Sequence, residues 1–263
     1  MRANSLDKII NKKKEKLNLL KKKFKIEDLK YKINKFDKYL NFKEKIYSNF
    51  LKDKFSLIAE IKKASPSAGV IIEDYNPVEI ASIYEKNNAT CLSVLTEEDY
   101  FNGSLDHISK IKEKINLPIL CKDFFIDKFQ IPLAKSFGAD AILLIVSALD
   151  QDQLEELYNV ALKYKMSVII EVHTIEEAKR IFDFSNAMIG INNRNLKTLK
   201  IDLNNTFEIY KSLNNFDGIL ISESGIKNKD DVLKISNQTN IKTFLIGESL
   251  LKNLDSNSIF SIL

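Results

Sequence analysis

The sequence has few of the residues that build covalent or metal-bound frameworks. Its 263 residues include two cysteines, Cys91 and Cys121, without a CxxC spacing, and only two histidines. No group of His, Cys and Asp residues has the spacing of zinc ligands. These shortages argue against a disulfide scaffold or a zinc site, and they predict a protein of a reducing compartment that uses no metal.

Long apolar runs and targeting signals are also absent. The longest apolar run, Ala141 to Val146, has the length of a strand, whereas a membrane span needs about 20 apolar residues. The lysine-rich start of the chain contains no apolar core of a secretory signal. We therefore expect a cytoplasmic protein with no membrane partner.

Two motifs that would indicate common enzyme classes are missing. No GxGxxG turn follows the first predicted strand, which disfavours an open, doubly wound sheet that binds a dinucleotide. No GxSxG segment occurs, and neither histidine stands near a candidate nucleophilic serine. The enzyme hypothesis favoured by these absences is a metal-free site that works with lysine and glutamate side chains.

The sequence does contain a nearly balanced set of charges. Lys and Arg number 40 against 36 for Asp and Glu, which gives a formal net charge of +4. Such a mild excess suits an anionic metabolite as well as a nucleic acid. With 44% hydrophobic residues, the chain is long enough for a sizeable core in one domain.

Residues 5–24 combine many lysines with apolar residues at helical spacing, namely Leu6, Ile10, Leu17, Leu20 and Phe24. One hypothesis is a basic arm that binds RNA or a membrane. The other is an amphipathic helix that packs on the body, with lysines that stay in water. The continuous apolar stripe favours the packed helix. A second helical segment is predicted over residues 36–51.

From residue 55 onward, short apolar runs alternate with helical patterns, such as those over 77–87, 150–165 and 174–184. Eight runs are candidate strands: 55–61, 90–95, 118–122, 141–146, 167–172, 187–192, 218–223 and 243–247. Continuous apolar runs are typical of parallel strands buried on both faces. The pattern predicts a single domain, a (β/α)₈ TIM barrel over 53–263 with a helical extension over 1–52.

Polar residues gather at the predicted strand ends, where enzymes of this fold carry their chemistry. Glu60 and Lys62 end the first strand two positions apart, so they point into the barrel mouth together if Ile61 packs outward. Opposite charges in a partly dry site shift each other's pKa. The alternative is a structural ion pair at the rim.

Lys122 directly follows the apolar third strand, which suits a lysine that faces the mouth. Desolvation or a nearby cation would lower its pKa toward that of a useful general acid; the alternative is a surface lysine. Phe124 shares its face and is a candidate for stacking on a planar ring, or else a core residue. Phe101, in the loop after the second strand, is a candidate for a second aromatic wall.

The fifth and sixth strands end in Glu171 and Asn192. A carboxylate at the end of an apolar strand needs a partner, which a lysine across the barrel would supply. His173 shares the face of Glu171, although a histidine here is more commonly an ordinary loop residue. Arg194 shares the face of Asn192, and both can donate hydrogen bonds to carboxylate, phosphate or hydroxyl groups.

Glycine turns follow the last two strands, in the segments 222–226 and 246–249. Barrels often bind phosphate at this place, because free N–H groups at a turn or a helix N-terminus suit an anion. The small, polar loop 64–69 after the first strand is a candidate lid or phosphate-contacting loop. The alternative for that loop is an ordinary connection.

Five segments at or beside the strand ends lie at residues 60–67 (EIKKASPS), 100–104 (YFNGS), 120–124 (LCKDF), 190–194 (GINNR) and 223–225 (ESG). In order and spacing, they resemble the signature segments of the indole-3-glycerol-phosphate synthase family. The resemblance runs from Leu6 almost to the C-terminus.

This resemblance implies a cofactor-free lyase of tryptophan biosynthesis. The reaction converts 1-(2-carboxyphenylamino)-1-deoxyribulose 5-phosphate to indole-3-glycerol phosphate, carbon dioxide and water. Matched by motif, the active-site residues are Glu60, Lys62, Lys122, Glu171, Asn192, Glu223 and Ser224. Those matching the phosphate side are Ser65, Gly225, Gly247, Glu248 and Ser249, and those matching the substrate-packing shell are Phe101, Phe124 and Arg194.

The implied chemistry fits these residue types. The ketone oxygen of the substrate needs a proton during ring closure, and we assign this proton to Lys122. The later dehydration needs an acid and a base, for which Lys62, Glu171 and Glu60 are the candidates. If the amide of Glu248 binds phosphate, its side chain should point away.

Two other functions stay open. Another phosphate-binding barrel, such as phosphoribosylanthranilate isomerase, would use a Cys and Asp pair, but Cys121 precedes Lys122 and should face the wrong way. A nucleic-acid-binding protein with a lysine-rich arm would bind RNA in a salt-dependent manner, yet this leaves the strand-end cluster unexplained. We expect a monomer that binds a phosphorylated small molecule and no nucleic acid.

Overall fold

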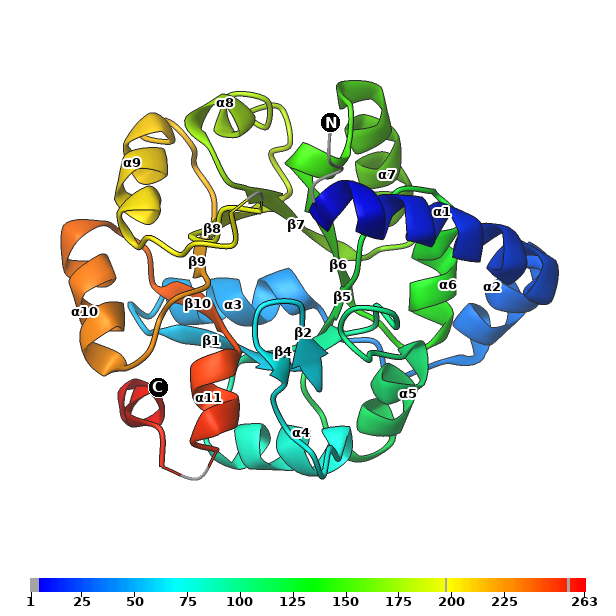
Figure 1. The fold of residues 1–263 in the computed structure, drawn as a ribbon, viewed down its shortest axis with the longest axis horizontal. Helices are drawn as coiled ribbons and strands as arrows, with labels where there is room; N and C mark the ends of the chain where they lie inside the picture. The colour runs from blue at the N-terminus through cyan, green and yellow to red at the C-terminus, as the bar shows by residue number, and fades with distance from the viewer. Residues whose placement is uncertain (1–4, 197, 255) are drawn as a thin grey trace.

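The computed structural model describes residues 5–196, 198–254 and 256–263, and its centre is a closed barrel of parallel strands (Figure 1). Neighbouring strands follow the order β1-β10-β9-β8-β7-β6-β5-β4. Their bounds are β1 (Ser56–Ile61), β4 (Cys91–Leu95), β5 (Ile119–Lys122), β6 (Ala141–Ile145), β7 (Ser167–Val172), β8 (Met188–Asn192), β9 (Leu220–Glu223) and β10 (Thr243–Ile246). Each lies within a predicted range, so the predicted (β/α)₈ barrel is confirmed.

Helices cover the outside of the barrel (Figure 1). They are α4 (Pro77–Lys86), α5 (Leu105–Lys114), α6 (Gln130–Ser136), α7 (Gln151–Lys163), α8 (Ile175–Ala178), α9 (Asn204–Ser212), α10 (Lys229–Gln238) and α11 (Glu248–Lys252), with 3₁₀ turns η1 (Val146–Ala148) and η2 (Ser258–Ile262). The helix predicted over 174–184 is wrong beyond its first turn. Just after α8, the side chain of Arg180 donates to the carbonyl oxygens of Val146 and Leu149, which holds the chain against η1.

The strands are packed on both faces, as their continuous apolar runs predict. Side chains such as Ile58 and Leu143 fill the barrel interior, whereas alternate residues such as Ile61 pack outward with the helices. Phe42 and Ile46 of α3 (Phe42–Phe50) join the interior cluster and are fully buried. They close the barrel where its strands begin, which leaves the opposite end as the mouth.

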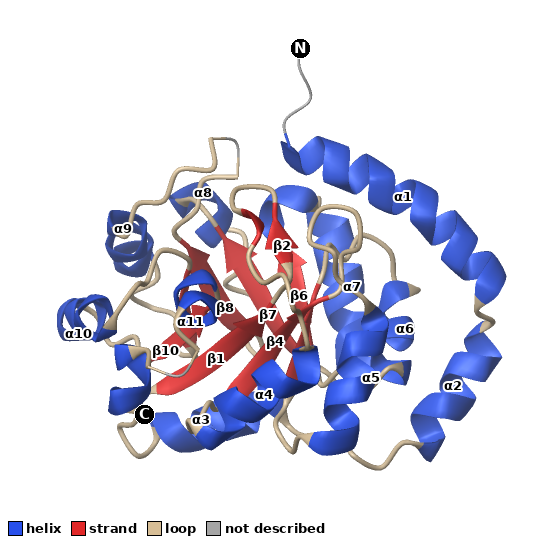
Figure 2. Cartoon of the chain, turned by 60° about the horizontal axis from the view of Figure 1, so that its bottom comes forward, coloured by secondary structure: helices blue, strands red, loops and turns tan. Residues whose placement is uncertain are grey.

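Two further helices, α1 (Ser5–Lys23) and α2 (Ile26–Lys35), form an outer layer beside α5 and α6 (Figure 2). The helix predicted over 5–24 is confirmed. The prediction for 36–51 is wrong at its start, because Asn41 caps α3 by accepting a hydrogen bond from a first-turn N–H. Helix α2 was not expected, since its apolar stripe is thin, with Leu29 as its buried residue. No helix in the described ranges is long and apolar enough to cross a membrane.

The loop after β1 contains a small antiparallel hairpin, β2 (Ala64–Ser65) and β3 (Gly69–Val70), which was not predicted from the sequence. Gly69 has a φ of 67°, in the left-handed region that favours glycine. Ile71 N–H donates to Lys63 O at 2.8 Å, which ties the returning chain to the end of β1. The hairpin therefore stands at the rim of the mouth, next to Lys62.

Candidate active site

The mouth of the barrel centres on the ammonium group of Lys122, at the end of β5. Its Nζ lies 2.7 Å from Glu223 Oε2, 3.5 Å from Glu171 Oε2 and 3.8 Å from Glu60 Oε2. These carboxylates come from β9, β7 and β1, so four strands contribute to one cluster. Lys122 is thus the lysine partner that the sequence led us to expect for Glu171.

Lys62 and Glu60 face the mouth together. Ile61 between them is buried on the helix-facing side of β1, and Lys62 Nζ lies 2.5 Å from Glu60 Oε1. Gly247 leaves room for this carboxylate, because a Cβ at that position would collide with Glu60 Oε1. Burial acts to raise the pKa of Glu60, but the cations Lys62 and Lys122 outweigh burial and lower it.

The expectation that the pKa of Lys122 is lowered is wrong. Burial does act in that direction, but the negative charges of Glu223, Glu171 and Glu60 outweigh it and raise the pKa of Lys122 above its usual value. Lys122 is therefore held as an ammonium ion. Such a cation gives up its proton when a strongly basic oxygen develops beside it.

Glu171 and Glu223 form a like-charged pair beside this ammonium. Burial acts to raise the pKa of Glu171, but Lys122 and His173 reverse the direction and lower it. Burial, together with the charge of Glu171, raises the pKa of Glu223 to about 7. Gly190 makes room for the pair, since a Cβ there would collide with Glu223 Oε1. Among the described residues, Glu171 faces two cations, His173 and Lys122, whereas Glu223 faces Lys122, so this arrangement favours Glu223 as the carboxylate that takes up a proton.

An aromatic wall, formed by Phe101 and Phe124, stands on one side of the cluster. The two ring centroids lie 6.4 Å apart, with the ring planes at 40°. Both rings line a cavity of ≈130 Å³ that also includes Lys122. They also line an apolar cavity of ≈110 Å³ with Leu6 and Ile9 of α1. The mouth therefore offers a planar aromatic group an apolar surface next to acid–base groups.

Asn192 and Arg194 also line the ≈130 Å³ cavity. The Arg194 N–H donates to Asn192 Oδ1 at 2.9 Å, and the Asn192 side chain helps to lower the pKa of Glu171. The guanidinium of Arg194 donates to Ser67 Oγ at 3.2 Å and to Leu199 O at 3.4 Å. Asn192 thus faces the carboxylates, while Arg194 leans toward the β2–β3 hairpin.

A second cavity, of ≈350 Å³, lies beside the cluster and between the ends of β9 and β10. Its lining includes Ser224, Gly225, Lys62 and the turn 247–249. Ser224 and Gly225 have φ values of 68° and 83°, a tight turn of the kind that exposes backbone N–H groups. The first N–H groups of α11 also have no partner within the helix. Backbone donors and a lysine thus surround a space suited to a phosphate group.

The side chains of Glu248 and Ser249 are engaged elsewhere. Glu248 Oε1 lies 2.6 Å from Lys252 Nζ, one turn along α11. Ser249 Oγ donates to Ile226 O at 2.8 Å, which links the two glycine turns. The carboxylate of Glu248 is therefore paired on its own helix, and the backbone N–H groups of both residues are the donors that this turn offers to a ligand.

Two residues singled out in the sequence lie outside the ≈350 Å³ cavity. Ser65 lines the apolar cavity rather than the one beside Gly247, and its Oγ accepts from Ala68 N–H at 3.1 Å within the hairpin. Cys121 belongs to the helix-facing core and lies 3.3 Å from Thr96 Oγ1. The cysteine needed for the isomerase hypothesis thus points away from the mouth, as expected.

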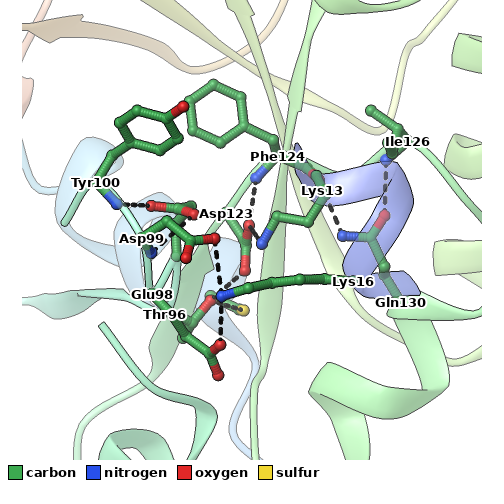
Figure 3. Close-up of polar contacts among 12 residues, drawn as sticks. Lys13, Lys16, Thr96, Glu98, Asp99, Tyr100, Asp123, Phe124, Ile126 and Gln130 are labelled. Atoms are coloured by element: carbon green, nitrogen blue, oxygen red, sulfur yellow. Dashed lines mark hydrogen bonds and ion pairs between the residues drawn. The ribbon is translucent and has the colours of Figure 1, made fainter. Parts of the chain in front are cut away.

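Helix α1 is fastened to the mouth by two of its lysines (Figure 3). Lys13 Nζ lies 2.6 Å from Asp123 Oδ1, and both side chains are buried. Lys16 bridges two carboxylates in the loop after β4, at 2.7 and 2.8 Å. The expectation that the lysines stay in water is wrong for Lys13. Because Asp123 Oδ1 also accepts from Phe124 N–H at 2.7 Å, this ion pair connects α1 to the aromatic wall.

One residue at the mouth, His173, lies closer to the carboxylates than its sequence position suggested. Its ring lies between two carboxylates, 3.1 Å from Glu171 Oε1 and 3.1 Å from Glu177 Oε2. The i, i+2 spacing from Glu171 was a signal that the two share a face. The spacing gave no sign of the second contact, because that contact requires α8 to begin directly after the strand end.

Comparisons with known proteins agree with this geometry. Residues 6–262 match the sequence model of the family described as "Indole-3-glycerol phosphate synthase". A protein of that name from Prochlorococcus marinus subsp. pastoris is 45% identical, covering 98% of this chain and 88% of its own length. "Tryptophan biosynthesis protein TrpCF" of Buchnera aphidicola subsp. Schizaphis graminum is 42% identical, covering 98% of this chain and 55% of its own length. A solved tryptophan synthase alpha chain from Legionella pneumophila matches in fold alone, with a TM-score of 0.61 at 12% identity over 85% of this chain and 94% of that one.

Proposed function

The chain belongs to the indole-3-glycerol phosphate synthase family, and from that premise we propose how its residues divide the reaction. Its activity is that of the family, a decarboxylating lyase of tryptophan biosynthesis. The substrate 1-(2-carboxyphenylamino)-1-deoxyribulose 5-phosphate closes to indole-3-glycerol phosphate, with loss of carbon dioxide and water. One observation carries the assignment of roles: three carboxylates converge on Lys122 beside a cavity that is large enough for a phosphate group.

Substrate binding uses the two ends of the mouth. The phosphate occupies the ≈350 Å³ cavity and accepts hydrogen bonds from the backbone N–H groups of Gly225, Gly247, Glu248 and Ser249, with the Ser224 turn beside it. The aromatic ring lies against Phe101 and Phe124, and Arg194 helps to position it. The phosphate role of Ser65 stays a prediction, since its hydroxyl is occupied within the hairpin.

In ring closure, an aromatic carbon attacks the ketone carbon, and Lys122 donates its proton to the ketone oxygen. Three carboxylates hold Lys122 as a cation and aim it into the mouth. The attack leaves positive charge on the ring and its nitrogen, which the ionised Glu171 stabilises electrostatically. Asn192 lines the same cavity and helps to keep Glu171 ionised by lowering its pKa. Loss of carbon dioxide then restores the aromatic ring.

Dehydration uses the second lysine of the mouth. Lys62, held by Glu60 at 2.5 Å, protonates the departing hydroxyl group so that it leaves as water. Glu171 removes a proton from the neighbouring carbon, which completes the indole ring. Two protons are donated and one is removed, so the reaction takes up one proton from solvent for each carboxylate lost. Glu223 holds Lys122 between turnovers.

The reaction itself is tested by supplying the wild-type protein with the carboxyphenylamino-deoxyribulose phosphate and recording the fluorescence of the indole product. We expect fluorescence to appear at a rate proportional to enzyme concentration. No turnover by well-folded wild type would overturn the assignment.

We also propose that the protein works in the cytoplasm as a monomer, without a nucleic-acid or membrane partner. Both cysteines are buried free thiols, which fits a reducing compartment. Lys13 and Lys16 are paired with carboxylates of the barrel rather than available to phosphates. Light scattering on the purified protein tests the monomer, and salt-dependent retention of RNA by the wild type would contradict the absence of a nucleic-acid partner.

A further inference from the structure

His173 occupies an unusual position for a residue that follows a barrel strand. Its Nε2 lies 3.1 Å from Glu171 Oε1 and its Nδ1 lies 3.1 Å from Glu177 Oε2, so the ring bridges two carboxylates. The side chain of His173 is 7% exposed, and that of Glu171 is 3% exposed. A neutral imidazole carries one N–H and would set the lone pair of its other nitrogen against one of these carboxylates, whereas an imidazolium faces both with positive charge. The Nε2 contact with Glu171 is an ion-pair contact, since Nε2 has no hydrogen-bond partner among the described residues.

The ring is held in place by its own loop. The His173 N–H donates to Glu177 Oε2 at 2.7 Å, the same oxygen that faces the ring. Glu177 N–H donates to the capping Thr174 Oγ1 at 3.2 Å, and Asn205 of α9 donates to His173 O at 3.2 Å. Backbone and side-chain contacts from two helices thus fix where the imidazole stands.

Each oxygen of Glu171 therefore faces a different cation. Oε1 faces His173 at 3.1 Å, and Oε2 faces Lys122 at 3.5 Å. The other groups that act on Glu171 are Asn192 of β8, which helps to lower its pKa, and the carboxylates Glu223 of β9 and Glu60 of β1, which repel it. His173 is the cation that Glu171 does not have to share with Glu223 and Glu60.

We propose that His173 is a positioning residue: as an imidazolium held by Glu177, it keeps the Glu171 carboxylate ionised and aimed beside Lys122. A proton shared by the two carboxylates then sits on Glu223, and Glu171 is free to stabilise the ring cation and to accept a proton. The role rests on the function assigned to Glu171 above. It does not require His173 to touch the substrate.

The charge balance supports this role. Burial acts to lower the pKa of His173, but contacts with Glu171 and Glu177 outweigh burial and raise it to about 9. The ring is thus charged at neutral pH and becomes neutral as the pH passes 9. Burial acts to raise the pKa of Glu171. Lys122 and then His173 outweigh burial and lower this pKa.

The charge of His173 is measured directly by a proton–carbon NMR titration of the two histidine rings. His107 is the internal reference, because burial and neighbouring lysines lower its pKa below the usual 6.5. We expect the ring that disappears in His173→Gln to titrate near pH 9 in the wild type, and about one unit lower in Glu177→Gln. A His173 ring that titrates at or below pH 6.5 overturns the proposal.

The effect on Glu171 is measured by the pH dependence of kcat/KM, which reports groups of the free enzyme. In His173→Gln, Glu171 loses one cation, so its pKa rises and the acid limb should move up by about one pH unit. In the same variant we expect kcat to fall about tenfold and KM to stay within about twofold of wild type. His173→Lys restores a positive charge beside Glu171, so its acid limb should return toward the wild-type pH. The substrate ionises identically in all three proteins and cancels from the comparison.

A purely structural histidine would lower the melting temperature of His173→Gln and leave the acid limb unmoved, and that result also overturns the proposal. If His173→Gln does not fold, the wild-type and Glu177→Gln titrations still decide the charge. The NMR result is independent of turnover. If the wild-type protein had no activity, the role assigned to Glu171 in the reaction would be wrong. The NMR titration would still show whether His173 is an imidazolium.

Discussion

Two buried lysines, ten positions apart in the sequence, use their charge in different ways. Lys112, on α5, lies near the floor of the barrel, 2.5 Å from Asp140 Oδ2, with side chains 2% and 0% exposed. Asp140 also accepts from Leu40 N–H and Ile119 N–H, and Lys112 donates to Lys38 O. One cation meets one carboxylate, and the carboxylate's oxygens are hydrogen-bonded.

Lys122 at the mouth meets three carboxylates instead of one. Among the described residues, Glu171 Oε2 and Glu223 Oε1 are buried without a hydrogen-bond donor. A balanced pair joins segments of the chain, whereas an unbalanced cluster keeps protons and charge available for chemistry. We therefore expect the ion pair at the floor to contribute to stability and the charged cluster at the mouth to contribute to the reaction.

The largest effect is expected from Lys122→Met, which removes the acid but keeps the side-chain length. We expect kcat/KM to fall about a thousandfold or more, because a positioned general acid contributes roughly 10²–10⁴. Steady-state kinetics with the indole readout measures the loss, and circular dichroism checks the fold. Activity within tenfold of wild type would refute the role of Lys122.

The matched change at the floor, Lys112→Met, should act on stability instead. Removing one partner of a buried ion pair leaves Asp140 uncompensated, and we expect a loss of about 3–5 kcal/mol in the free energy of unfolding. Urea unfolding at pH 7 measures it. Lys112→Met combined with Asp140→Asn is the control and should recover part of the loss. A single variant as stable as wild type would contradict the structural role of the pair.

The Glu223→Gln variant tests the charged cluster at the mouth through the pH dependence of the free energy of unfolding. The pKa of Glu223 is raised to about 7 from 4.5, so its contribution to stability is present below pH 4.5 and is lost as the pH rises through 7. Gln does not titrate, so the variant does not lose this contribution. The free energy of unfolding of Glu223→Gln minus that of wild type should therefore increase by roughly 1–3 kcal/mol between pH 5 and pH 8. Urea unfolding at both pH values measures the difference. A difference that stays constant with pH would show that Glu223 titrates normally.

The smallest effect is expected from Glu248→Ala at the phosphate cavity. Because its carboxylate pairs with Lys252 and its N–H is the proposed donor, KM should change by less than about twofold. Gly247→Ala is the control, since its Cβ would collide with Glu60 Oε1, and it should reduce kcat. A large rise in KM for Glu248→Ala would mean that the side chain itself contacts the substrate.

Much of the barrel and part of the mouth follow from local sequence patterns. Each strand is an apolar run, so the eight strands could be placed without any knowledge of long-range contacts. The period of two along a strand also sufficed to direct Glu60 and Lys62 to one face. Helix α2 was not predicted because its apolar stripe is thin, and the β2–β3 hairpin because each of its strands has two residues.

Contacts between distant segments could not be predicted. The pKa of Lys122 was expected to be lowered, because the three carboxylates that raise it come from other strands. The burial of Lys13 depends on Asp123, more than a hundred positions away. The second contact of His173 depends on where α8 begins. In each case, the sequence places a residue on a face but does not say which charges meet it there.

The most direct test of the contrast between floor and mouth is the turnover number of Lys112→Met and Lys122→Met, measured in the same assay per folded molecule. Folded concentration is set from circular dichroism at a temperature where both variants are native. We predict that Lys112→Met keeps a kcat within about threefold of wild type, while Lys122→Met loses about a thousandfold. Equal losses in both variants, or a larger loss in Lys112→Met, would contradict the account.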